Sequence, residues 1–130
     1  MVRVNVKKTS NYPVSVRKLK ITLRTFFANH GIVSDAEVSI AIVGEARMLE
    51  LGKKYLKETG KTPHNVFSFT PDEVRGKFIY PPDGVIHLGE IIICYPRVVK
   101  DAKKEGKLID EMVNELAQHS ALHLMGIHHE

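Results

Sequence analysis

The C-terminal segment constrains the fold of this chain most, because it combines a helical apolar pattern with a cluster of histidines. Apolar or small residues recur at helical spacing from about Leu108 to Met125, which predicts an amphipathic helix packed on a sheet. They are Ile109, Met112, Val113, Leu116, Ser120 and Leu124. Four of the seven histidines fall within the last twelve residues. The histidine cluster therefore begins on the second half of this predicted helix.

The spacing of these histidines is that of a metal site. His119 and His123 are four residues apart, so on a helix their side chains project from one face, one turn apart. Gly126 follows where the helix should end, because glycine adopts the left-handed conformation of a helix C-terminus without steric penalty. The chain can then turn back and present a third imidazole. Spacing points to His129 for this role but does not exclude His128.

Three neutral imidazoles suit zinc, and they leave the fourth tetrahedral position open for water, as in catalytic zinc sites. A zinc-bound water has its pKa lowered to about 7, so hydroxide becomes available at neutral pH. An i, i+4 histidine pair alone is more often two surface side chains, but the third histidine after a helix-ending glycine favours a metal. We therefore expect one Zn²⁺ per chain.

The same spacing occurs in the metzincin protease signature H-E-x-x-H-x-x-G-x-x-H. In those enzymes a glutamate that acts as general base follows the first histidine, whereas Ser120 stands there in this chain. A hydroxyl without an activating partner cannot replace a carboxylate as the base. The sequence therefore argues against a peptidase of this type.

The remaining sequence predicts one α+β domain over residues 1–130, with a mixed sheet of about four strands and with the histidine helix lining a metal cleft. No repeat or linker divides the chain. Strands are expected at Val2 to Val6, Val38 to Val43, Val66 to Phe69 and Val85 to Cys94. Helices are expected at about Pro13 to Asn29, Glu45 to Leu56 and Pro96 to Glu105.

Composition bounds the location and the partners of the chain. The N-terminus has no signal-peptide pattern, no apolar run is long enough to span a membrane, and Cys94 is the single cysteine. We therefore expect a cytoplasmic protein with no membrane partner, in which Cys94 is a buried core thiol. The net charge of +4 and the pI of about 9.2 are compatible with a polyanionic partner such as RNA, although mild basicity is common in other proteins.

Three segments together resemble a known family. The run HSALHLMGIHH is similar to the H-G-x-L-H-L-x-G-Y-D-H signature of the YbeY endoribonucleases. The run HNVFSF, which starts at His64, resembles the family's T-D-V-L-S-F strand, and LGEIII, which starts at Leu88, resembles its L-G-D-I-x-I strand. With the order of elements, the resemblance covers nearly the whole chain, and the histidine signature is its specific part.

The resemblance implies a zinc-dependent, single-strand-specific endoribonuclease that acts in ribosomal RNA maturation and ribosome quality control. The family's zinc ligands correspond to His119, His123 and His129, which decides between His129 and His128. The implied partners are single-stranded RNA, ribosomal RNA and proteins of the small ribosomal subunit. The catalytic group would be the zinc-bound water held by the three histidines.

The chain also departs from the family pattern. Ser120 replaces a glycine, Ile127-His128 replaces Tyr-Asp, and His64-Asn65 replaces Thr-Asp. The family arginine that follows the position of Tyr55 is absent, and Leu56 and Lys57 stand there instead. Lys57 and His128 are therefore candidates for altered catalytic roles. These departures also motivate two alternatives, which are a weakly catalytic or non-catalytic zinc-containing ribosome assembly factor and a zinc hydrolase of another substrate.

Several other residues are candidates with a simpler alternative. Four lysines could hold an RNA backbone or form a solvated face, and Ser68 could join them or mark a polar strand face. These lysines are Lys53, Lys54, Lys57 and Lys61. Glu115, one turn before His119, is a candidate hydrogen-bond acceptor that would orient that ligand, although a solvated helix residue is the commoner case. His87 lies in a predicted strand, where a lone histidine is more often structural.

Overall fold

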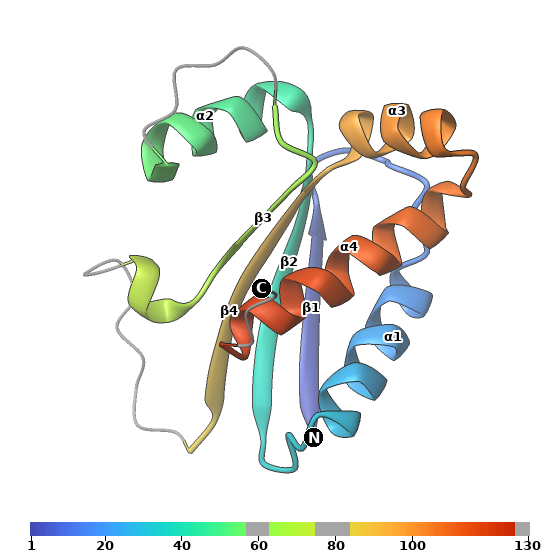
Figure 1. Cartoon of the computed structure of the whole chain (residues 1–130). Coiled ribbons are helices and arrows are strands. Elements are labelled where there is room, and N and C mark those ends of the chain that lie inside the picture. The colour runs from blue at the N-terminus through green and yellow to red at the C-terminus, as the bar shows by residue number, and fades with distance from the viewer. Residues whose placement is uncertain (57–62, 75–83, 127–130) are drawn as a thin grey trace.

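A four-stranded mixed sheet forms the centre of the protein in the computed structural model, which describes residues 1–56, 63–74 and 84–126 (Figure 1). The strands are β1 (Val2–Lys8), β2 (Ala36–Val43), β3 (Val66–Phe69) and β4 (Ile86–Cys94). Their order in the sheet is β1-β2-β4-β3. β1, β2 and β4 are mutually parallel, whereas the edge strand β3 runs antiparallel to β4.

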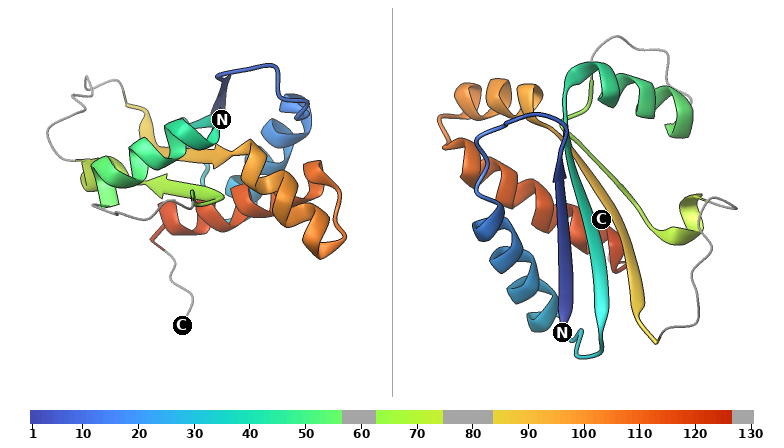
Figure 2. Two further views of the ribbon diagram at one scale, coloured as in Figure 1. Left: turned by 90° about the horizontal axis from the view of Figure 1, so that it is seen from above. Right: turned by 180° about the vertical axis from the view of Figure 1, so that it is seen from behind.

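Within the described part of the chain, four α-helices and one short 3₁₀ helix accompany the sheet. They are α1 (Val16–Asn29), α2 (Glu45–Leu56), the 3₁₀ helix η1 (Pro71–Val74), α3 (Tyr95–Glu105) and α4 (Ile109–Leu124). α1 and α4 lie on one face of the sheet and α2 lies on the other, while α3 leads from β4 into α4 (Figure 2). The architecture is therefore a single α+β domain with a four-stranded mixed sheet, as the sequence predicted, and the structure adds that helices lie on both faces of the sheet.

The larger core lies between the sheet and the helix pair α1 and α4. Alternate residues of β2, Val38, Ile40 and Ile42, are buried on this face, as the period-2 alternation of a strand requires. α4 packs against this face of β2 through two fully buried alanines, Ala117 and Ala121. Because alanine side chains are small, the second half of α4 can lie close to the sheet.

A smaller core lies on the opposite face, under α2. Met48 and Leu51 of α2 pack there against Phe67 and Phe69 of β3. Cys94, at the end of β4, belongs to the same cluster, and burial raises the pKa of its thiol. The expectation of a buried core cysteine is thus confirmed.

The observed element boundaries correct the predictions at several ends. α1 begins at Val16 and not near Pro13, because the Ser15 hydroxyl caps the helix by accepting a hydrogen bond from the backbone N–H of Lys18. β1 continues to Lys8, since its polar last residues still pair in register with β2. β2 starts earlier than predicted, at Ala36, and η1 was not predicted.

Candidate metal centre at the end of α4

The second half of α4 carries the two histidines that the spacing singled out. His119 is exposed, and the side chain of His123, one turn later, is 41% exposed. Ser120 between them is only 3% exposed, so it faces the core and not the histidine side of the helix. The predicted arrangement of both histidines on one side of a sheet-packed helix is therefore confirmed for these two residues.

Gly89 of β4 sets how closely β3 and the end of α4 approach each other. Its φ of +131° lies in a region that residues with a side chain rarely adopt. A Cβ atom at this position would stand 2.1 Å from the carbonyl oxygen of Phe69 and 2.9 Å from a methyl carbon of Leu124. The absence of a side chain at Gly89 therefore lets the histidine end of α4 lie against β3 and β4.

This close approach brings the segment after β3 to His123. The carboxylate oxygen Oε1 of Glu73, in η1, lies 3.0 Å from Nε2 of His123. The same oxygen accepts hydrogen bonds from the backbone N–H and the hydroxyl of Thr70, each at 3.0 Å. Burial would raise the pKa of the Glu73 carboxyl, but the bonds from Thr70 and His123 outweigh it and lower this pKa. The carboxylate is thus held in its charged form beside His123.

Glu73 lies beside His123 although the sequence patterns did not single it out. Thr70-Pro71-Asp72-Glu73 has the form of a capping box, in which the side chain of a Glu three residues after the N-cap returns to the N-cap N–H. The observed bond from the Thr70 N–H to Glu73 is that interaction, and proline stands at the first helical position, where it is favoured. This signal would have predicted η1, but nothing in it would have placed Glu73 next to His123.

The donor set at this place fits a zinc ion. Imidazole nitrogens and a carboxylate oxygen are the ligands that zinc takes in proteins besides cysteine. Within residues 1–56, 63–74 and 84–126, no group of three such side chains is close enough to hold a metal ion. The predicted third ligand, His129, lies outside the described residues, as does His128. The zinc site therefore stays a prediction, supported by two of its three histidines.

The hydrogen-bond partner that the structure gives Glu115 is Lys107, whereas the sequence suggested His119. Its Oε2 atom accepts a hydrogen bond of 2.7 Å from the ammonium group of Lys107, and its side chain is 48% exposed. This ion pair joins the first half of α4 to the turn before the helix. The pair agrees with the simpler interpretation of Glu115 as a solvated helix residue.

The candidate RNA-binding residues are divided between the two faces of the sheet. Lys53 and Lys54 are exposed near the end of α2, on the face opposite to α4, and the Lys54 ammonium lies 5.3 Å from the centre of the Tyr55 ring. Ser68 alternates along β3 with Phe67, which faces α2, so Ser68 lies on the α4 side. Lys57 and Lys61 lie outside the described residues.

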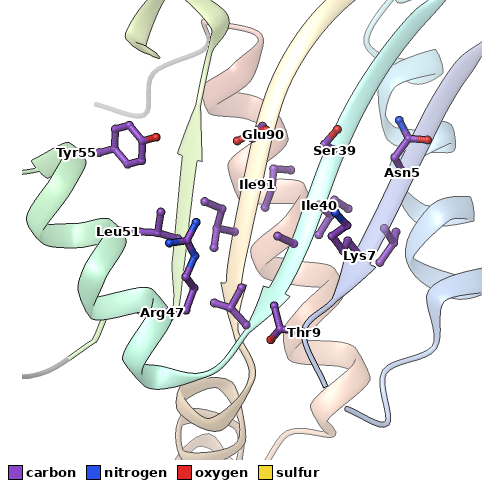
Figure 3. A pocket seen from close by; sticks show the side chains of 14 residues that line it. Asn5, Lys7, Thr9, Ser39, Ile40, Arg47, Leu51, Tyr55, Glu90 and Ile91 are labelled. Atoms are coloured by element: carbon purple, nitrogen blue, oxygen red, sulfur yellow. The ribbon is translucent and has the colours of Figure 1, made fainter. Parts of the chain in front are cut away.

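A cavity of about 510 Å³ also lies on the α2 side of the sheet, not at the histidines (Figure 3). Arg47 of α2 and Lys7 of β1 stand on its two sides, and the side chains of Ser39 and Glu90 lie along one end (Figure 3). Its lining contains no histidine among the residues that the structure describes. The predicted metal cleft along α4 is therefore a separate place from this cavity.

His87 lies on the same sheet face as this cavity and is paired with a carboxylate. Its Nδ1 atom is 2.7 Å from Oε1 of Glu37, the residue directly opposite it on β2. Arg3 of β1 follows in the same row, 3.8 Å from the other oxygen of Glu37. The structure thus places His87 in a row of polar side chains across three strands, with Glu37 and Arg3, away from α4.

The fold and the histidine helix together define a class of protein, a mixed-sheet α+β domain with paired histidines on its sheet-packed C-terminal helix. A family model described as "Endoribonuclease YbeY" matches residues 5–130, so the chain belongs to this family. Among the described residues, no helix is long and apolar enough to cross a membrane.

Individual relatives agree with this assignment. An Endoribonuclease YbeY of Moorella thermoacetica is 33% identical over 129 residues, covering 93% of this chain and 80% of the relative. One of Roseiflexus castenholzii is 33% identical over 114 residues, covering 88% of this chain and 67% of the relative. One of Azoarcus sp. is also 33% identical, but the match spans only 40% of its length and 80% of this chain.

A solved structure supports the fold independently. The solution structure of TM1509 from Thermotoga maritima superposes with a TM-score of 0.62 at 21% identity, covering 98% of this chain and 75% of that one. At this identity the likeness concerns the fold alone. It confirms the α+β architecture that the sequence predicted.

Proposed function

We propose that this chain is a zinc-dependent, single-strand-specific endoribonuclease that acts in ribosomal RNA maturation and ribosome quality control. The observation that carries the proposal is the pair His119 and His123, one turn apart on α4, in a chain of the Endoribonuclease YbeY family. The matching relatives are named endoribonucleases, and the histidine spacing suits a metal site with an open position.

Zinc bound at this site would supply Lewis acidity toward a phosphoryl oxygen and an activated water. His119 and His123, with His129, would hold the ion at the end of α4. Lys53 and Lys54, with Lys57 and Lys61, would attract the RNA backbone, since each phosphate contact releases counterions. Ser68 faces the α4 side of β3, so it can contact RNA near the histidines. Lys57 and His128 are the candidates for replacing the family groups that this chain lacks.

The proposed setting is the cytoplasm, with ribosomal RNA as substrate and proteins of the small ribosomal subunit as partners. The basic net charge of +4 supports a nucleic acid partner, because it favours association with a polyanion. A second candidate function, a zinc-containing assembly factor with weak or no cleavage, is favoured by one observation. Leu56 and Lys57 stand where the family has an arginine, and lysine lacks the bidentate fork of arginine.

The test is cleavage of a labelled single-stranded RNA by the purified protein and by His123→Ala, each with its zinc content measured. We expect the wild type to hold about one zinc per chain and to cleave, and the variant to have lost both. The variant controls for contaminating ribonuclease. A wild type that holds zinc but cleaves no faster than His123→Ala contradicts the nuclease proposal and favours the assembly factor.

A further inference from the structure

We propose that α1 and the groove between α1 and α4 form a binding surface for single-stranded RNA, in which one base stacks on the ring of His30. This inference rests on the proposed function for the identity of the ligand, but it places RNA on residues outside both the histidine signature and the lysines of α2. The charge of α1, the side chains of the groove and its position beside the histidines of α4 support the proposal.

α1 carries the excess positive charge of the whole chain. The sequence has 19 lysines and arginines against 15 acidic residues, which gives the net charge of +4. α1 contains four of these cations and no acidic residue, so the rest of the chain has equal numbers of the two. The four are Arg17, Lys18, Lys20 and Arg24. Because clustered lysines and arginines attract nucleic acid, the preference of this chain for a polyanion is concentrated on α1.

A shallow groove of about 520 Å³ lies between α1 and α4. The two helices begin side by side, where the Asp110 carboxylate accepts a hydrogen bond of 3.1 Å from the backbone N–H of Ser15, and they diverge toward their C-terminal ends (Figure 1). Among the described residues, none that lines the groove is an acid, a lysine or an arginine. The groove therefore suits an uncharged part of a ligand, while phosphates would lie on the cations outside it.

The groove carries aromatic rings and amides, the side chains by which proteins commonly bind unpaired RNA bases. The rings of Phe26 and His30 are stacked, with their centroids 4.1 Å apart and an angle of 25° between their planes. Phe26 is partly buried against the core, whereas His30 is exposed, so a base can continue the stack on the outer face of the imidazole. Asn29 and Gln118 line the same groove and supply amides that can hydrogen-bond to the edge of a base.

The groove connects the charged helix with the candidate metal centre. Lys18 precedes Thr22 by one helical turn, so it lies on the side of α1 that Thr22 presents to the groove. Gln118 directly precedes His119, and at 1.5 Å per residue it lies about 7.5 Å along the helix axis from His123. A strand of RNA with one base in the groove would therefore lie near both histidines.

His30→Leu and His30→Phe separate a role in RNA binding from a role within α1. The stack joins residues four apart on one helix, and Nδ1 of His30 lies 2.8 Å from the carbonyl oxygen of Phe26, so both contacts also stabilise the end of α1. Both variants lose the imidazole nitrogens, but only His30→Phe keeps an aromatic face for a base. Thermal melts of the two variants show whether the fold is kept.

Arg17→Gln with Lys18→Gln tests the charge of α1. The matched control is Lys103→Gln with Lys104→Gln, which removes the same charge from another exposed pair, in the last turn of α3. The N-cap of α1 is kept in the first double variant, because the hydrogen bond to Ser15 comes from the backbone of Lys18.

The measurement is the affinity for a fluorescein-labelled single-stranded RNA, by anisotropy over a salt series, with the RNA checked on a gel to be intact after each titration. We expect His30→Leu to bind about 5- to 100-fold more weakly, as for the loss of one stacked base, and His30→Phe to stay within about twofold of the wild type. The α1 double variant should lower the slope of log K against log salt by roughly 1.4, at about 0.7 per phosphate contact. The α3 control should leave this slope unchanged.

Wild-type affinity in His30→Leu overturns the stacking site, as does an equal loss in His30→Leu and His30→Phe. An unchanged slope in the α1 double variant, or an equal fall in the α3 control, overturns the role of α1 in binding phosphates. Failure of the proposed function gives a different result. A protein that binds RNA through α1 but cleaves none contradicts the nuclease proposal alone, whereas one that cleaves RNA while all the α1 variants bind like the wild type contradicts the α1 surface alone.

Discussion

Two histidine–glutamate pairs lie on opposite faces of the sheet, and their settings differ. His87 and Glu37 are direct neighbours in the strand register, their side chains are 15% and 28% exposed, and Arg3 lies beside Glu37. His123 and Glu73 are 50 residues apart in sequence, more exposed, and joined by the approach of η1 to α4. The contact distances, 2.7 Å and 3.0 Å, are nearly alike.

The comparison shows that a histidine–carboxylate contact does not by itself identify a functional site. Cross-strand pairs of opposite charge are an ordinary means of stabilising a sheet, so the row from Arg3 to His87 needs no further explanation. At α4, His123 has a second histidine one turn away, His119, and lies in the segment that resembles the histidine signature of the family. The proposed function therefore gives a role to the pair at α4, whereas the other pair is explained by the stability of the sheet.

The largest expected effect that tests this assignment is that of His123→Gln. Outer-shell partners of metal ligands are worth 10- to 100-fold in metal affinity or activity, so loss of a ligand should reduce both by more than about 100-fold. Zinc binding and cleavage of single-stranded RNA measure the effect. Retention of wild-type values for both would remove the distinction between the two pairs.

Gly89→Ala should have the next largest effect, on stability. The new Cβ would meet the backbone oxygen of Phe69 at 2.1 Å, and φ of +131° is strained for alanine. Strain and overpacking each cost about 1–3 kcal/mol, so we expect a loss of about 3 kcal/mol or more in the free energy of unfolding. Urea denaturation measures this loss, with Gly31→Ala as a control that shares the positive φ, at +87°, but lacks any heavy atom within 4 Å of the added Cβ. Equal losses in the two variants would show that the close approach of β3 and α4 is not the cause.

A smaller effect, on RNA binding, is expected from the double variant Lys53→Glu/Lys54→Glu near the end of α2. If both lysines contact RNA phosphates, the double variant should bind single-stranded RNA several-fold more weakly at low salt. The slope of log K against log salt should fall by roughly 1.4, at about 0.7 per phosphate contact. Binding measured by fluorescence anisotropy over a salt series tests this. An unchanged slope would identify these lysines as a solvated face and would confine RNA binding to other residues.

The smallest effect is expected from His87→Gln, the counterpart of the first variant. The amide N–H of a glutamine at this position can donate a hydrogen bond to Glu37, so the free energy of unfolding should change by less than about 1 kcal/mol. Zinc affinity and RNA cleavage should equal those of the wild type. A loss of cleavage with an intact fold would move His87 into the functional site and contradict the structural assignment.

Much of the architecture followed from residue patterns. Helix Glu45–Leu56 and strand Val66–Phe69 begin and end where they were predicted, and α4 lies within one residue of its predicted range. These segments have strong periodicity or clear end signals, which act over a few neighbouring residues. The start of α1 was placed too early because Pro13 fits a first helical turn, while the capping bond of Ser15 decided the actual boundary.

The sequence by itself determined the pair of histidines on one face of a helix, because a helical spacing of four converts directly into a shared direction. It also determined the family, through motifs that lie in three separate segments. Only the tertiary structure decided that Glu73 meets His123 and that Lys53 and Lys54 lie across the sheet from the histidines. Such contacts depend on how whole elements pack, here on the close approach of β3 and α4 that Gly89 permits. The spacing of residues along the chain carries no information about them.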